Sequence, residues 1–139
     1  MQIYFSCSIT GGRQDQPIYQ RIVEHLQARG HTVPTALLAD AQMEPPEAQL
    51  DAAAVYARDV NWVKTSQALI AEVSTPSHGV GYEIGLAESL GLPVLCCYQV
   101  GRKVSKMITG NPSPAVMVRA YRTPDEALEI LDAFLKKIG

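Results

Sequence analysis

The sequence predicts an α/β protein with a five-stranded parallel sheet and helices on both faces, a flavodoxin-like or Rossmann-like three-layer sandwich. Short apolar runs alternate along the chain with longer segments in which apolar residues recur at helical spacing. The runs are continuous rather than alternating with polar residues, which is typical of parallel strands covered on both faces. With 139 residues the chain can bury one sizeable core, so we expect a single domain over residues 1–139.

Five apolar runs are predicted to be strands, and the second of them is the weakest. In chain order they are 2–9 (QIYFSCSI), 31–38 (HTVPTALL), 68–73 (ALIAEV), 92–100 (LPVLCCYQV) and 115–121 (AVMVRAY). Sheets of this kind bind ligands at the carboxyl ends of their strands. The loops after the first, third and fourth runs are therefore the expected site.

Four helices are predicted from the spacing of apolar residues and from signals at the helix ends. They span residues 17–29, 50–66, 82–90 and 125–138. Pro17 suits a first helical turn, and Gly30 and Gly91 suit the position after a helix end. Thr123 is the expected N-cap of the last helix, with Glu126 as its capping-box partner.

Composition narrows the class of protein. The formal net charge is −2 and no block of Lys and Arg stands out, so a nucleic-acid polymer is not an expected partner. No apolar run approaches the ~20 residues of a membrane span, and the first residues read as a strand rather than a signal peptide. We therefore expect a cytoplasmic protein.

Cysteines and histidines give no pattern of a disulfide framework or a metal site. The cysteines are odd in number and two are adjacent within an apolar run, as expected of buried core thiols. The histidines lack ligand spacing, so we expect no metal. The residues concerned are Cys7, Cys96, Cys97, His25, His31 and His78.

Glu83 is the most informative acid, because it follows a glycine-rich loop and is predicted in the first turn of a helix. It could be a surface charge, a ribose-binding acid or a nucleophile. A helix N-terminus favours its ionised form by roughly 0.3–1 kcal/mol. A dinucleotide site is rejected: GVGYEIG has the wrong glycine spacing, follows the third strand, and is followed by Gly101, Arg102 and Lys103 where an acid is needed.

Asp59 and Tyr4 are the other unusual residues. Asp59 lies within an apolar helical stripe, where it either serves the site or pairs with Arg58 or Arg13. Tyr4, in the first strand, is either a core aromatic or a hydroxyl that holds a carboxylate. Two carboxylates facing one cleft are the minimum set for breaking a glycosidic or N-glycosidic bond.

Four segments in order carry a resemblance to a known family: IYFSCSITGGR (3–13), ARDVNW (57–62), PSHGVGYEIG (76–85) and VSKMITG (104–110). They resemble the nucleoside 2-deoxyribosyltransferase family, and most closely its 2′-deoxynucleoside 5′-phosphate N-hydrolases. The resemblance implies that Glu83 attacks the anomeric carbon of the sugar and that Tyr4 orients it. It implies that Asp59 protonates the leaving base or activates water, and that no cofactor is needed.

The resemblance also implies how a phosphate is bound. Ser77 stands where the transferases typically have an Asp that would repel phosphate, and Ser105 stands where they have an Asn. Ser105 is implied to reach into the site of a neighbouring subunit, so we expect a homodimer. The implied substrate-binding residues are Ser8, Thr10, Gly11, Arg13, Ser77, Gly79, Ser105 and Met107.

Three functions remain open at this level. The first is hydrolysis of (2′-deoxy)nucleoside 5′-monophosphates, and the second is deoxyribosyl transfer between nucleobases. The third is nucleotide binding without catalysis. The hydrolases carry Arg and Gly at the positions of Thr10 and Cys7. Arg13 and Lys106 are the cations that could replace the missing phosphate contact of that Arg.

Overall fold

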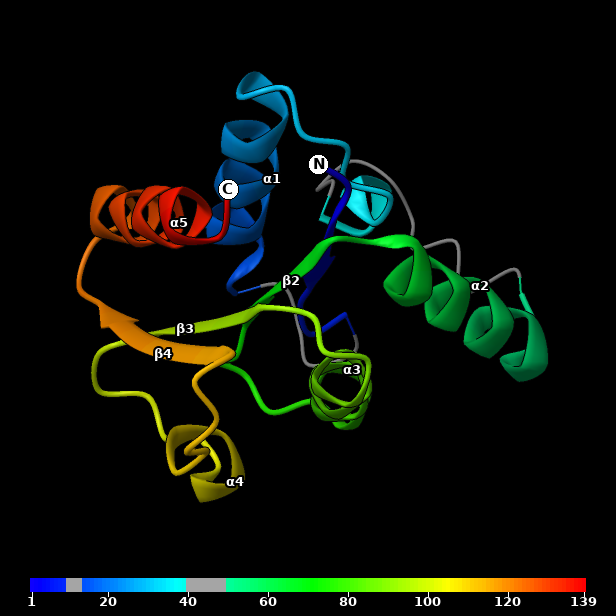
Figure 1. Ribbon diagram of the computed structural model, residues 1–139. Coiled ribbons are helices and arrows are strands. Elements are labelled where there is room, and N and C mark those ends of the chain that lie inside the picture. The colour runs from blue at the N-terminus through cyan, green and yellow to red at the C-terminus, as the bar shows by residue number, and fades with distance from the viewer. Residues whose placement is uncertain (10–13, 40–49) are drawn as a thin grey trace.

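A computed structural model of the chain describes residues 1–9, 14–39 and 50–139. In these residues strands and helices alternate as the sequence predicts, except between Gln16 and Thr65, where the described elements are all helices (Figure 1). The elements are β1 (Ile3–Ser6), α1 (Gln16–Ala28), the 3₁₀ helix η1 (Ala36–Ala39), α2 (Ala52–Thr65), β2 (Ala68–Glu72), α3 (His78–Ser89), β3 (Val94–Gln99), α4 (Lys106–Thr109), β4 (Val116–Tyr121) and α5 (Pro124–Ile138).

The sheet is parallel throughout, in the order β1-β2-β3-β4. Among the described residues it has four strands, so the prediction of a fifth at 31–38 is wrong. That segment makes one isolated parallel bridge, between Gln2 and Thr32, and then turns into η1. Pro34 has no N–H to donate to a ladder, and Thr35 instead donates its hydroxyl to the Phe5 carbonyl at 2.7 Å.

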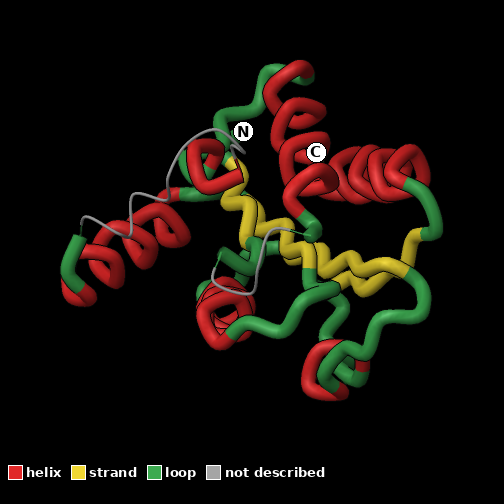
Figure 2. The backbone as a smooth tube through the Cα atoms, turned by 180° about the vertical axis from the view of Figure 1, so that it is seen from behind, coloured by secondary structure: helices red, strands yellow, loops and turns green. Residues whose placement is uncertain are grey.

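Helices lie on both faces of the sheet, giving three layers (Figures 1 and 2). One face carries α1 and α5, and the other carries α2 and α3. Alternate strand residues divide between two cores. Phe5 and Ile70 pack toward α1 and α5, whereas Tyr4 and Leu69 pack toward α2 and α3.

The predicted core thiols are confirmed: all three cysteines are buried, and none of them forms a disulfide. Burial raises the pKa of the Cys96 thiol to about 12, and that of Cys97 also rises, chiefly by burial. Both thiols are therefore protonated and unreactive at neutral pH. In the part of the chain that the structure describes, no helix is long and apolar enough to cross a membrane.

The predicted helices at 17–29, 50–66 and 125–138 are confirmed to within two residues at each end. Thr123 caps α5 by accepting a hydrogen bond from the Glu126 N–H at 3.1 Å. The third helix begins at His78 rather than at residue 82, because Ser77 is its N-cap and accepts from the Val80 N–H. Glu83 consequently lies in the second turn, and the prediction that it lies in the first is wrong.

Candidate functional site

The carboxylate of Glu83 is held by two hydroxyl groups of β1. The Tyr4 hydroxyl donates to its Oε2, and the Ser6 hydroxyl donates to its Oε1 at 2.8 Å. Tyr4 and Ser6 are two residues apart in a strand, so their side chains leave the sheet on the same face. That face is the one covered by α3, and both Glu83 oxygens are therefore fixed from the sheet.

Burial is the main influence on the charge of Glu83. It raises the pKa of this carboxyl, and the negative charge of Asp59 raises it further. The hydrogen bonds from Tyr4 and Ser6, and the charge of Arg58, lower it. The ionised form is therefore supported by two hydroxyl donors rather than by the helix N-terminus that the sequence suggested. Burial and the nearby Glu83 also raise the pKa of Tyr4, so its hydroxyl remains a donor.

Asp59 is brought to the same place by α2. Its Oδ1 accepts from Arg58 Nε at 2.9 Å, and both side chains are 19% exposed. The Arg58 guanidinium lies over the Trp62 ring, 4.9 Å from its centroid. The ion pair with Arg58, one of the two alternatives left open by the sequence, is thus present, and Asp59 also lines the cavity that contains Glu83. The two readings of this acid are compatible.

A cavity of about 530 Å³ lies between α2 and α3 and contains both acids. Its other walls are mainly apolar and include two exposed tyrosines, whose rings meet edge to face at 6.1 Å. The wall residues other than the acids are Leu50, Ala52, Val55, Tyr56, Val60, Val63, Gly79, Tyr82 and Leu86. Two carboxylates among apolar and aromatic walls suit a ligand with a planar ring and a reactive polar bond.

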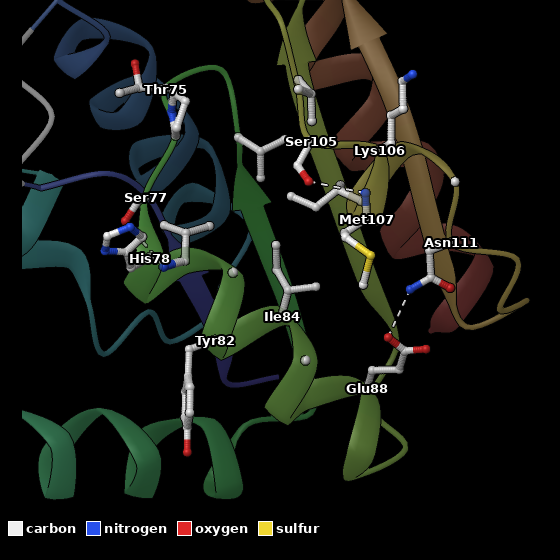
Figure 3. Close-up of a pocket in the computed structure, with 18 of the residues that line it drawn as sticks. Thr75, Ser77, His78, Tyr82, Ile84, Glu88, Ser105, Lys106, Met107 and Asn111 are labelled. Atoms are coloured by element: carbon white, nitrogen blue, oxygen red, sulfur yellow. Dashed lines mark hydrogen bonds between the residues drawn. The ribbon is translucent and has the colours of Figure 1, made fainter.

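A second cavity, of about 1320 Å³, lies on the other side of α3, between α3 and α4. Figure 3 shows Ser77 and His78 at the start of α3, with Ser105 and Met107 on the opposite wall. Ser105 is the N-cap of α4 and accepts from the Met107 N–H at 3.2 Å. Met107 is 86% exposed. Tyr82 lines both cavities, so α3 separates two adjacent spaces.

The predicted site residues therefore fall into groups. Tyr4, Asp59 and Glu83 come together, and Gly79 lines the same cavity. The residues that line the second cavity are Ser77, Ser105 and Met107. Ser8 is buried just beyond β1. Thr10, Gly11 and Arg13 lie outside the described residues.

Ser6 is the site residue that the sequence reasoning missed. A serine within a strand gives no signal by itself. The available signal was its spacing of two from Tyr4, which placed both hydroxyls on one face. Among the described residues, no group of three or more His, Cys, Asp or Glu side chains could hold a metal ion.

The model of the nucleoside 2-deoxyribosyltransferase family matches residues 3–128. A 5-hydroxymethyl-dUMP N-hydrolase of Danio rerio is 38% identical over 141 aligned positions, covering 99% of this chain and 98% of that protein. A Methanococcoides burtonii protein, provisionally named 2′-deoxynucleoside 5′-phosphate N-hydrolase 1, is 40% identical over 121 residues. The match covers 87% of this chain and 99% of that protein.

Among solved structures, a Clostridium botulinum CMP N-glycosidase superposes with a TM-score of 0.75. The superposition covers 96% of this chain and 99% of that one. The sequence identity is 18%, so this likeness supports the Rossmann-like α/β fold and nothing finer.

Proposed function

Because the chain belongs to the nucleoside 2-deoxyribosyltransferase family, we propose that it hydrolyses the N-glycosidic bond of (2′-deoxy)nucleoside 5′-monophosphates. The products are the free base and the sugar 5-phosphate. One observation carries the proposal: Glu83 is held by Tyr4 and Ser6 in a cavity that it shares with Asp59. A protein that only binds nucleotides has no need of a carboxylate fixed in this way.

In the proposed first step, a Glu83 oxygen attacks the anomeric carbon as the bond from that carbon to the base nitrogen breaks. The electron pair of the broken bond goes to the base, which takes a proton from Asp59 after this carboxylate has taken one from solvent. Tyr4 and Ser6 hold the attacking carboxylate in place without removing its charge. The result is a sugar ester of Glu83.

In the second step, water attacks the same carbon and the ester bond to Glu83 breaks. Asp59 takes a proton from the attacking water and passes it to solvent, which leaves both carboxyl groups ionised as at the start. Hydrolysis therefore differs from transfer only in the acceptor, which is water rather than a second base. The apolar wall of the cavity suits the base in both reactions.

Two observations favour a 5′-phosphate substrate. The relatives named above are called hydrolases of nucleoside monophosphates. In this chain Ser77 begins a helix, where backbone N–H groups and a hydroxyl can receive an anion. A carboxylate at that position would repel it.

We propose a homodimer in which Ser105 serves the site of the neighbouring subunit. Within one chain Ser105 lines the cavity between α3 and α4 and does not line the one that holds Glu83. The exposed Met107 next to it is suited to a subunit contact. Sedimentation velocity at micromolar concentration is expected to give twice the chain mass of 15.1 kDa. A species of the monomer mass would contradict the dimer.

The proposed function is tested by measuring release of free base from ribo- and deoxynucleoside 5′-monophosphates and from the matching unphosphorylated nucleosides. We expect monophosphates to be cleaved in water alone, with kcat/KM about tenfold or more above that of the nucleosides, as for loss of a charged contact. Activity that requires an added acceptor base and ignores the phosphate would instead establish deoxyribosyl transfer. Binding without turnover would leave only the non-catalytic function.

A further inference from the structure

A second group of polar side chains lies at the carboxyl ends of the strands, on the face covered by α1 and α5. Its members are far apart in sequence and make short contacts with one another. They are Asp15, Glu72, Ser74, Thr75, Arg102 and Tyr121. None of them belongs to the catalytic step proposed above.

Asp15 is the N-cap of α1, yet its carboxylate makes no hydrogen bond to that helix. An N-cap Asp ordinarily accepts from the N–H of the second or third helical residue, and here the second is Pro17, which has none. The Asp15 carboxylate turns away instead. It accepts from Arg102 Nη2 at 2.6 Å and from the Thr75 hydroxyl at 2.6 Å.

Arg102 connects this carboxylate to the loop after β2. Its Nη1 donates to the Ser74 carbonyl at 3.4 Å while Nη2 is held by Asp15. The Asp15 side chain is 8% exposed and that of Arg102 is 29% exposed, so the pair is largely shielded from water. A planar guanidinium can hold two partners at a fixed angle, which a flexible ammonium cannot.

Glu72, at the end of β2, also holds the loop that follows this strand. Its carboxylate accepts from the Ser74 N–H at 2.7 Å, from the Ser74 hydroxyl at 2.9 Å and from the Tyr121 hydroxyl. The Ser74 oxygen in turn accepts from the Gln99 N–H at 2.8 Å. Ser74 is therefore tied to β2, β3 and β4 before the chain reaches Thr75 and α3.

We propose that Asp15 and Arg102 are positioning residues for the 5′-phosphate side of the site, an inference that rests on the proposed function. Together they join the start of α1, the loop that leads to Ser77, and the loop that leads to Ser105. The Arg102 charge is compensated by Asp15, so the arginine acts through these loops rather than as the phosphate ligand. Contacts to a phosphate require loops that are held within a few tenths of an ångström.

The test compares Arg102→Gln and Asp15→Asn with the control Arg21→Gln. The control also breaks an Arg–Asp ion pair, to Asp125 at 2.7 Å, but on the exposed surface. We expect Arg102→Gln and Asp15→Asn to raise KM for the monophosphate and Kd for 2-deoxyribose 5-phosphate by about tenfold. kcat is expected to stay within about twofold, and the control to change nothing. Arg102→Lys is expected to be intermediate, because an ammonium can pair with Asp15 but cannot hold both partners.

Two results would overturn the inference. One is an unchanged Kd for 2-deoxyribose 5-phosphate in both variants. The other is an equal loss of kcat/KM on the monophosphate and on the unphosphorylated nucleoside, which would mark a general structural role. Calorimetric binding of 2-deoxyribose 5-phosphate does not depend on turnover. If the wild-type protein binds 2-deoxyribose 5-phosphate but releases no base, only the proposed function is contradicted. If the wild-type protein does not bind this sugar phosphate, both the proposed function and the positioning role are contradicted.

Discussion

Replacing Glu83 with Gln is expected to lower kcat for base release by on the order of 10⁴-fold or more, as when other enzymes lose their nucleophile. The amide keeps an oxygen that can accept from Tyr4 or Ser6, so the local contacts largely survive. It cannot form the sugar ester. Initial rates on the preferred monophosphate measure the effect. Glu129→Gln, on the exposed side of α5, is the matched control and is expected to match the wild type.

The same variant is expected to remain folded and to melt at or above the wild-type temperature at pH 7. Burial raises the folded-state pKa of Glu83 above its unfolded value. The contribution of such a carboxyl to stability is present below its unfolded pKa and is lost as the pH rises through its folded pKa. At neutral pH the charge therefore costs stability, and Gln removes that cost. Retention of more than about 1% of the wild-type kcat by folded Glu83→Gln would contradict a role as nucleophile.

The parallel sheet could be predicted from sequence because its strands are largely apolar: β1 and β2 are buried along their whole length, and β3 is buried from Val94 to Cys97. The segment 31–38 has a similar composition, but an apolar run does not reveal whether a ladder partner exists. There the chain makes one bridge, and the Pro34 ring and the Thr35 hydroxyl turn it into η1. The edge of the sheet was consequently assigned one strand too many.

The start of α3 was misplaced for a different reason. Gly79 and Gly81 suggested a loop, since glycine costs roughly 1 kcal/mol in a helix interior. The structure shows that the cap at Ser77 and the packing of Val80 and Ile84 against the sheet outweigh this preference. Sequence propensity is local, whereas packing is set by the rest of the fold.

In the candidate site, too, some residues could be predicted from the sequence and others depend on how the chain packs. The sequence singled out Tyr4, Asp59 and Glu83, and the structure brings these three together. Ser6 was missed although its spacing of two from Tyr4 was a usable signal, whereas nothing in the sequence indicated the Asp15–Arg102 pair, whose members are 87 residues apart. Such contacts depend on which loops meet at the carboxyl edge of the sheet, and a single sequence does not encode that as a pattern.

Asp59→Asn is expected to lower kcat by about 10²–10⁴-fold, the range for loss of a general acid or base. Asn keeps an oxygen that can accept from Arg58 Nε, so the helix contact is retained while the exchangeable proton is lost. A substrate analogue whose leaving group departs without protonation, such as 4-nitrophenyl 2-deoxyriboside 5-phosphate, should lose much less when the burst of 4-nitrophenol is followed. Equal losses on both substrates would contradict proton donation by Asp59.

The pH dependence of kcat/KM offers a separate check on the role of Glu83, because Asp59 raises the pKa of this carboxyl and Tyr4 lowers it. The nucleophile must be ionised, so kcat/KM is expected to fall as the pH drops through the pKa of Glu83, which lies above its ordinary value of 4.5. Asp59→Asn removes a negative charge and should move this acid limb to lower pH. Tyr4→Phe removes a hydrogen bond and should move it to higher pH. Shifts in the same direction, measured as kcat/KM profiles of the two variants, would show that the limb does not report Glu83.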